Sequence, residues 1–273
     1  MCIVCAEEMI LVLLFAVLTV AMSASGSLSR FSLRQAINLP ALKKLGSLLR
    51  NPSLVVPQIS IKSLSELDFV KLKARGVKYL VFDKDNTLTR AFEDDLHDSV
   101  KEAVDKAHTE FPGKIAILSN SVGSSDDKGY KAAAETEKSL RIPVIRHRVK
   151  KPACLAEVKE HFSSKEKVVN EYKIVDLNDP LTVRATPTRS VGEASEEETD
   201  NRVVLPSEIC MIGDRVLTDV VFANINGMVS VLVAPLCVRT DHPIAVAIRF
   251  LEVKILLPLL RLVGIQARAL SKN

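Results

Sequence analysis

Short hydrophobic runs alternate with longer amphipathic stretches from residue 77 onward, and this alternation predicts a repeat of strand and helix. Each run has the length of a buried strand, and the stretches between runs carry apolar residues at helical spacing. Strands separated by helices favour a parallel sheet with right-handed crossovers. We therefore predict a three-layer α/β domain over about residues 70–236. The predicted strands are Val77–Phe82, Lys114–Leu118, Ile142–Ile145, Glu208–Ile212 and Val229–Val233, and the predicted helices are Leu96–Glu110, Asp127–Leu140, Pro152–Phe162 and Leu217–Asn226.

Residues 163–206 interrupt this repeat. Their second half, Thr186–Asn201, is rich in Ser, Thr and Glu, and its low hydrophobicity and like charges predict a disordered surface insertion. We therefore divide the chain into a leader over residues 1–49, a domain over residues 50–243 that contains the insertion, and a C-terminal helix over residues 244–273.

The C-terminal segment carries apolar side chains at helical spacing with Arg249, Lys254, Arg261 and Arg268 among them. Pro258 is expected to kink or end this helix, because proline cannot donate the backbone hydrogen bond of a helix interior. A basic amphipathic helix either lies on a membrane surface or packs against its own domain, and the sequence leaves both open.

The leader is apolar and basic. No Asp or Glu occurs between Met9 and Ser65, and Met9–Met22 has only Thr19 as a polar residue, which is short for a membrane span. This composition favours a mitochondrial targeting leader, with a plastid leader or a membrane anchor as the alternatives. The net charge of +4 is mild, and the five cysteines do not form a disulfide pattern, so we expect a reducing compartment.

Two aspartates, Asp83 and Asp85, directly follow the first predicted strand. They can converge at its carboxyl end, where two carboxylates suit Mg²⁺ and can divide nucleophilic attack and proton transfer between them. For this pair alone, an ordinary polar turn is the alternative explanation.

Three further strands also lead into groups that suit phosphate chemistry, and the carboxyl ends of parallel strands meet at one edge of a sheet. Hydroxyl and amide groups follow the second strand, basic groups the third, and carboxylates with an arginine the fourth. These residues are Ser119 and Asn120, then His147, Lys150 and Lys151, and then Asp214, Arg215 and Asp219.

The order Asp-x-Asp-x-Thr, Ser, Lys and Gly-Asp-x-x-x-x-Asp resembles the haloacid dehalogenase-like superfamily over residues 77 to about 235. The resemblance implies a Rossmann-like parallel sheet and Mg²⁺ as cofactor. It implies that Asp83 is the nucleophile, which forms an aspartyl-phosphate, and that Asp85 is the general acid and base. The metal would be held by the carboxylates of Asp83 and Asp214 and the backbone carbonyl of Asp85, with Asp219 supporting these ligands from behind.

The same resemblance implies that Ser119 and a lysine neutralise the transferring phosphoryl group. Lys151, next to Pro152, is the favoured lysine, and Lys150 is the alternative. Asn120 would also bind the substrate. His147 and Arg215 are candidates for contacting a second phosphate of the substrate, although intramolecular pairing is the more common role for such residues.

The residues within and around these motifs narrow the resemblance to the YqeG-like branch and its mitochondrial relatives, the phosphatidylglycerophosphate phosphatases of cardiolipin synthesis. It covers about residues 50–240 and includes Asp83-Lys84-Asp85-Asn86-Thr87 and Ser119-Asn120-Ser121. The implied activity is hydrolysis of phosphatidylglycerophosphate to phosphatidylglycerol and phosphate. Only about 30 residues separate Asp83 from the second strand, so we expect no large cap domain and a site open to bulky substrates.

The expected partner is therefore a phospholipid substrate at a membrane surface, on the matrix face of the mitochondrial inner membrane or alternatively in a plastid. No nucleic-acid partner is expected, and the sequence does not indicate an oligomeric state. Two alternative functions remain at this point. One is a phosphatase for phosphoproteins or small soluble phosphomonoesters, and the other is a membrane-associated scaffold with a vestigial catalytic set.

Overall fold

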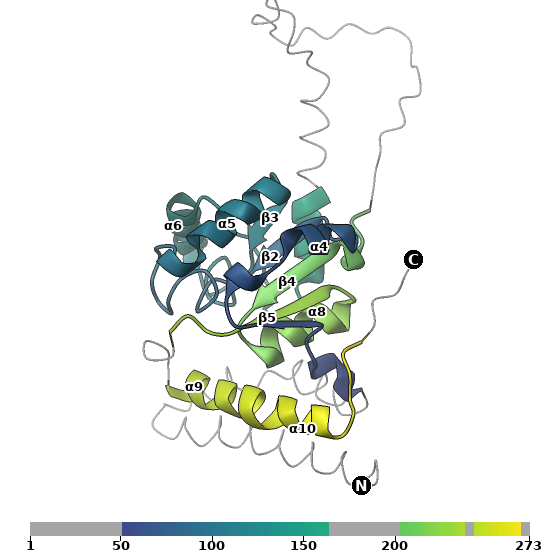
Figure 1. Ribbon diagram of the computed structural model, residues 1–273. Helices are drawn as coiled ribbons and strands as arrows, with labels where there is room; N and C mark the ends of the chain where they lie inside the picture. The colour runs from purple at the N-terminus through teal and green to yellow at the C-terminus, as the bar shows by residue number, and fades with distance from the viewer. Residues whose placement is uncertain (1–50, 164–202, 238–242, 269–273) are drawn as a thin grey trace, which may run out of the picture.

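The computed structural model describes residues 51–163, 203–237 and 243–268, and these ranges form an α/β domain around a five-stranded sheet (Figure 1). The strand order is β1-β5-β4-β2-β3, and every neighbouring pair is parallel. The strands are β1 (Ile59–Ile61), β2 (Tyr79–Phe82), β3 (Ile115–Ile117), β4 (Ile209–Gly213) and β5 (Val229–Val233).

Helices connect the strands and continue beyond the last one. The α-helices are α4 (Phe69–Ala74), α5 (Asp98–Glu110), α6 (Lys131–Leu140), residues 155–163, α8 (Val221–Asn226), α9 (Pro243–Phe250) and α10 (Leu257–Leu262). Short 3-10 helices cover Pro52–Val55, Leu64–Glu66, Lys128–Tyr130 and Pro206–Glu208, and π-helical segments cover Val216–Val220 and Leu251–Leu256.

The central strands are buried on both faces, which is why they are almost entirely apolar. Alternate side chains of each strand point to opposite faces. Leu80 and Phe82 therefore join the core beneath α4, α5 and α6, whereas Tyr79 and Val81 join a second core beneath α8 and the helix at residues 155–163. The predicted three-layer α/β architecture is confirmed.

Four of the five predicted strands are present, with small differences at their ends. The predicted strand Ile142–Ile145 is wrong, since this segment forms only one parallel bridge, between Val144 and Ile117. The short edge strand β1 was not predicted. Its three residues carry too little periodicity to be recognised, and pairing with β5 stabilises it.

Pro152 does not occupy the first turn of a helix as predicted, because it lies in a turn and the following helix begins at residue 155. Pro258 also does not end the C-terminal helix. A π-helical segment precedes it and α10 continues to Leu262, which places the proline in the first turn of α10, where its missing N–H is tolerated.

Within the described residues, the segment between β2 and β3 consists of a loop and α5, so no cap domain is inserted at this position. The C-terminal helices pack on the domain next to α8 and β5 (Figure 1). This packing buries Leu256, Leu257 and Leu260, whereas Phe250 and Leu262 stay exposed.

The predicted leader and nearly all of the predicted insertion lie outside the described residues. Among the helices of the described ranges, none combines the length and hydrophobicity that crossing a membrane requires.

Candidate active site

The loop after β2 turns sharply so that Asp83 and Asp85 stand at the carboxyl edge of the sheet. Asn86 adopts a left-handed conformation with φ of 59°, which asparagine tolerates better than most residues. The backbone carbonyl of Lys84 accepts hydrogen bonds from three successive backbone N–H groups at residues 87–89. The side-chain oxygen of Asn86 accepts from the backbone N–H of Cys237, which ties this loop to the segment after β5.

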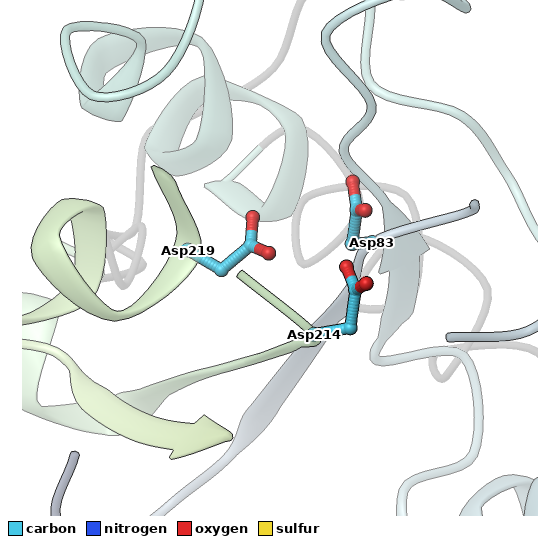
Figure 2. Close-up of side chains that lie close together, drawn as sticks. All are labelled: Asp83, Asp214 and Asp219. Atoms are coloured by element: carbon cyan, nitrogen blue, oxygen red, sulfur yellow. The ribbon is translucent and has the colours of Figure 1, made fainter. Parts of the chain in front are cut away.

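Three carboxylates meet at this edge, and two of them directly follow neighbouring strands. Asp83 follows β2, Asp214 follows β4 directly, and Asp219 lies in the π-helical segment Val216–Val220. One carboxylate oxygen from each lies within 4.8 Å of the other two, and all three residues are buried (Figure 2). The sequence assigned Asp219 to a supporting position, and the structure places it beside the other two.

Gly213 allows this approach. A Cβ atom at this position would lie 2.3 Å from Asp219 Oδ2 and 2.4 Å from Asp219 Cγ, much closer than atoms can approach. The absence of a side chain therefore lets the end of β4 contact Asp219 directly. The Gly-Asp pair of the sequence motif thus has a steric reason as well as a chemical one.

Lys151 joins two of the carboxylates. Its Nζ donates to Asp83 Oδ1 at 2.7 Å and to Asp219 Oδ1 at 2.6 Å, and its side chain is only 2% exposed. Lys150 instead contacts Asp126 Oδ2 at 2.5 Å with 41% of its side chain exposed. The structure therefore selects Lys151 over Lys150 as the lysine next to the proposed nucleophile.

Arg249 of α9 contacts the third carboxylate. Its Nη2 lies 2.6 Å from Asp214 Oδ2, and both side chains are buried. Neither oxygen of Asp214 has a partner with hydrogen-bond geometry among the described residues, so the contact of Oδ2 with Arg249 is an ion pair. A buried carboxylate oxygen without a partner is costly, and a bound cation would satisfy it.

Burial and mutual repulsion control the charges of this cluster. Burial, assisted by the charge of Asp219, raises the pKa of Asp83 to about 6 although Lys151 opposes this shift. Burial also raises the pKa of Asp214 well above its ordinary value, against the effect of Arg249. For Lys151, burial lowers the pKa, but Asp219 and Asp83 outweigh burial and raise it. The lysine therefore stays charged, and a further cation would favour the ionised forms of Asp83 and Asp214.

This donor set fits Mg²⁺, which prefers carboxylate oxygens and accepts few protein ligands. Asp83 and Asp214 would supply their carboxylates, as the sequence indicates. The side chain of Asp85 is not part of the carboxylate cluster. The assignment of its side chain to proton transfer and of its backbone carbonyl to a metal stays a prediction.

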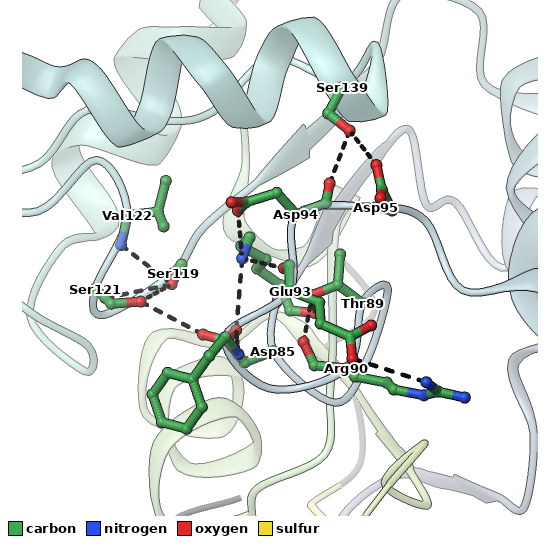
Figure 3. Close-up of polar contacts among 12 residues, drawn as sticks. Asp85, Thr89, Arg90, Glu93, Asp94, Asp95, Ser119, Ser121, Val122 and Ser139 are labelled. Carbon is green, nitrogen blue, oxygen red and sulfur yellow. Dashed lines mark hydrogen bonds and ion pairs between the residues drawn. The ribbon is translucent and has the colours of Figure 1, made fainter. Parts of the chain in front are cut away.

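The Asp85 side chain is instead held by neighbouring loops. Its Oδ1 accepts from the backbone N–H of Phe92 at 3.3 Å, and its Oδ2 accepts from Ser121 Oγ at 3.4 Å (Figure 3). Lys84 Nζ lies 3.6 Å from Asp85 Oδ1 and donates to the backbone carbonyl of Glu93 at 2.6 Å. Lys84 was not singled out from the sequence. Its place between the two aspartates is the signal that could have indicated a supporting role in this loop.

The loop after β3 brings two more predicted residues to the cleft. Ser119 Oγ accepts from the backbone N–H of Ser121 at 3.2 Å and lies 3.0 Å from Ser121 Oγ (Figure 3). The side-chain oxygen of Asn120 accepts from the backbone N–H of Lys151 at 2.9 Å. Asn120 thereby positions the lysine as well as lining the cleft.

The cleft at this edge has a volume of about 740 Å³. Eight of the ten predicted site residues line it, together with Phe92, Lys128 and Arg249, which were not predicted to do so. The lining includes Asp83, Asp85, Ser119, Asn120, Lys150, Lys151, Asp214 and Arg215.

His147 and Asp219 are not part of this lining. His147 is buried, its Nδ1 lies 3.1 Å from the backbone carbonyl oxygen of Ile145, and burial lowers its pKa. The structure therefore places His147 in the interior, where it does not face a ligand in the cleft. Arg215 does line the cleft, and its backbone N–H donates to Asp219 Oδ2 at 3.2 Å.

Comparisons with known proteins cover both halves of this site. Residues 39–196, which include Asp83, Ser119 and Lys151, match the family model described as mitochondrial PGP phosphatase. Residues 186–235, which include Asp214 and Asp219, match a model described as HAD-hydrolase-like. No solved structure matches the chain.

Curated relatives carry related names. Phosphatidylglycerophosphate phosphatase 1, chloroplastic/mitochondrial, from Arabidopsis thaliana is 31% identical over 229 residues, which are 82% of this chain and 54% of the relative. The chloroplastic phosphatidylglycerophosphate phosphatase 1 of Chlamydomonas reinhardtii is 32% identical over 189 residues, 68% of this chain and 55% of the relative. The mitochondrial phosphatidylglycerophosphatase GEP4 of Saccharomyces cerevisiae is 26% identical over 181 residues, 66% of this chain and 78% of the relative.

The chain spans about half the length of the Arabidopsis and Chlamydomonas relatives. The first family match, however, extends over more than half of this chain and includes Asp83, Ser119 and Lys151. The chain therefore belongs to the mitochondrial PGP phosphatase family.

Proposed function

We propose that this protein is a Mg²⁺-dependent phosphatase that hydrolyses phosphatidylglycerophosphate to phosphatidylglycerol and phosphate, a step of cardiolipin biosynthesis. One observation carries the chemistry: Asp83 contacts Lys151 within a buried carboxylate cluster, whereas the Asp85 side chain is held outside that cluster. One carboxylate is thus placed to attack and the other to move protons. The names of the curated relatives support the choice of substrate.

In the first step, a carboxylate oxygen of Asp83 attacks the phosphorus of the terminal phosphate, and the bond from phosphorus to the lipid oxygen breaks. Asp85 gives a proton to that oxygen, so phosphatidylglycerol leaves as an alcohol. Lys151 and Ser119 neutralise the phosphoryl oxygens. A bound Mg²⁺ would add positive charge where negative charge develops in the transition state.

In the second step, Asp85 removes a proton from water, and the water oxygen attacks the phosphorus of the aspartyl-phosphate. The bond between phosphorus and Asp83 breaks, which releases inorganic phosphate and restores the Asp83 carboxylate. Asp85 ends the cycle protonated and is ready for the next substrate. The contacts of Asp85 with Phe92 and Ser121 support both roles, since they hold its carboxyl group at the cleft.

The size and rim of the cleft support a lipid headgroup as the bound portion. A volume of about 740 Å³ suits a glycerophosphate headgroup with the acyl chains left outside. Lys128, Lys150 and Arg215 supply positive charge to the lining. The ring of Phe92, which is 77% exposed at the same cleft, offers an apolar contact to the lipid interface.

The place of action that we propose is the matrix face of the mitochondrial inner membrane, with a plastid as the alternative. The basic and apolar leader supports a targeted protein, and the names of the relatives include both organelles.

The experiment compares three substrates with the purified protein and Mg²⁺: phosphatidylglycerophosphate in mixed micelles, a soluble phosphomonoester and a phosphopeptide. We expect phosphate release from the lipid, and none with Asp83→Asn. Efficient turnover of a soluble ester or the peptide without turnover of the lipid would replace the lipid with the soluble-substrate alternative. Absence of turnover for all three, with intact folding, would favour the scaffold.

A further inference from the structure

The C-terminal helical segment, residues 243–262, is built into the domain beside the active site. Leu256, Leu257 and Leu260 are buried and pack in one cluster with Val216 and Val220 of the π-helical segment that carries Asp219. Removing three leucine side chains from water stabilises the docked segment. Docking is therefore a stable property of the fold.

The buried carboxylate of Glu252 fixes the C-terminal segment to the π-helical segment that carries Asp219. Glu252 accepts from the backbone N–H of Val216 at 3.1 Å and from that of Leu217 at 3.3 Å. These two groups are free donors at the start of a helical segment, so Glu252 acts as a cap from a distant part of the chain. Arg249 precedes Glu252 by three residues, which places both on one side of the C-terminal helix.

Arg249 uses this alignment to hold one oxygen of Asp214. Its Nη2 lies 2.6 Å from Asp214 Oδ2, with the arginine side chain 7% exposed and the aspartate 1%. Asp214 Oδ1 is left buried without a hydrogen-bond partner among the described residues. Oδ2 also lacks a partner with hydrogen-bond geometry among these residues, so its ion-pair contact with the Arg249 guanidinium is what distinguishes it from Oδ1.

We propose that Arg249 is a positioning residue for the metal site: it fixes the Asp214 carboxylate so that Oδ1 is presented to Mg²⁺. This inference rests on the proposed function, and it adds a residue from beyond residue 235, where both family-model matches have ended. It also gives the basic C-terminal segment a role inside the active site, distinct from a contact of its basic residues with a membrane.

Provided that Asp214 stays ionised, charge alone predicts the opposite behaviour, and this makes the proposal testable. If Arg249 acted only as a cation near the site, its removal would strengthen Mg²⁺ binding by removing repulsion. If Arg249 orients Asp214, its removal lets the carboxylate rotate and weakens binding. Groups that hold metal ligands in place typically contribute 10–100-fold to metal affinity.

The test is calorimetric titration of Mg²⁺ alone into the full chain, stripped of metal and held in detergent. The variants are Arg249→Gln, Arg249→Lys and the control Arg261→Gln, an exposed arginine on the same helical segment. We expect Arg249→Gln to weaken Mg²⁺ binding about 10–100-fold. Arg249→Lys should recover part of this loss, because the ammonium can still reach an oxygen of Asp214. Arg261→Gln should bind as the wild type does.

Equal or tighter Mg²⁺ binding by Arg249→Gln would overturn the proposal, as would an equal loss in Arg261→Gln. If Arg249→Gln does not fold, Arg249→Lys decides, with a several-fold loss expected and no loss overturning the proposal. No substrate enters this test. A failure to hydrolyse phosphatidylglycerophosphate therefore leaves the metal result standing, whereas a wild-type protein that binds no Mg²⁺ overturns the inference.

Discussion

Replacing Lys151 with methionine removes the cation that two buried carboxylates share. Lys151 Nζ lies 2.7 Å from Asp83 and 2.6 Å from Asp219, and its side chain is 2% exposed. Breaking a buried ion pair from one side costs about 3–5 kcal/mol, because the remaining charge has no partner. For a domain of this size each kcal/mol lowers Tm by about 2–4 °C, so we expect Tm to fall by roughly 6–20 °C.

The neighbouring lysine provides the matched control. Lys150 pairs with Asp126 at 2.5 Å, but its side chain is 41% exposed, and exposed pairs contribute about 0–1 kcal/mol. Lys150→Met should therefore change Tm by less than about 4 °C. Removing the phosphoryl-binding cation should lower kcat about 10²–10³-fold in Lys151→Met only.

The assay combines calorimetric unfolding of metal-free protein with phosphate release from phosphatidylglycerophosphate at saturating Mg²⁺. Circular dichroism of each variant at the assay temperature ensures that lost activity does not reflect unfolding. The reasoning would be refuted if Lys150→Met lost more activity than Lys151→Met, or if both variants unfolded at the wild-type temperature.

Three further predictions concern the same edge of the sheet. Asp83→Asn should abolish a trapped acyl-phosphate, whereas Asp85→Asn should slow its formation and its hydrolysis; rapid-quench labelling that shows an acyl-phosphate on Asp83→Asn would contradict the assignment. Gly213→Ala should cost about 1–3 kcal/mol and most of the activity because its Cβ would displace Asp219. Gly227→Ala has open space around its Cβ but a left-handed φ of 75°, so it should lose stability and retain activity. Urea unfolding and phosphate release measure both variants, and equal activities would contradict the steric account. Since burial raises the folded-state pKa of Asp83 from 3.8 to about 6, its protonation stabilises the metal-free protein below about pH 4, and this contribution is lost as pH rises through 6. Urea unfolding in EDTA should show a smaller loss between pH 4.5 and 7.5 for Asp83→Asn than for the wild type, and identical pH dependence would contradict the shift.

The residues at the strand ends could be predicted because their placement follows from local pattern and one general rule. An apolar run followed by Asp83 or Asp214 marks a buried strand and the point where it ends. Parallel strands then bring these ends to one edge, whatever the details of packing. The same reasoning recovered Ser119, which follows β3 and lines the cleft with the two aspartates.

Edge strands and interior polar residues were harder to predict, because their state depends on distant partners. Ile59–Ile61 is a strand because β5 lies beside it, and Ile142–Ile145 forms only one bridge, although its composition favours a strand. His147 follows that segment into the interior, where Ile145 contacts its ring. A short apolar segment has too few residues for its own pattern to specify register or exposure.

The sequence favoured Lys151 but kept Lys150 as the alternative, since adjacent lysines have the same chemistry and only the direction of each side chain separates them. Arg249 was hidden, because its sequence context is that of any basic amphipathic helix. Packing of the C-terminal helix, through its leucines and Glu252, brings Arg249 to Asp214. The sequence thus specifies the reactive groups that local strand geometry presents, whereas long-range packing specifies which cations neutralise them.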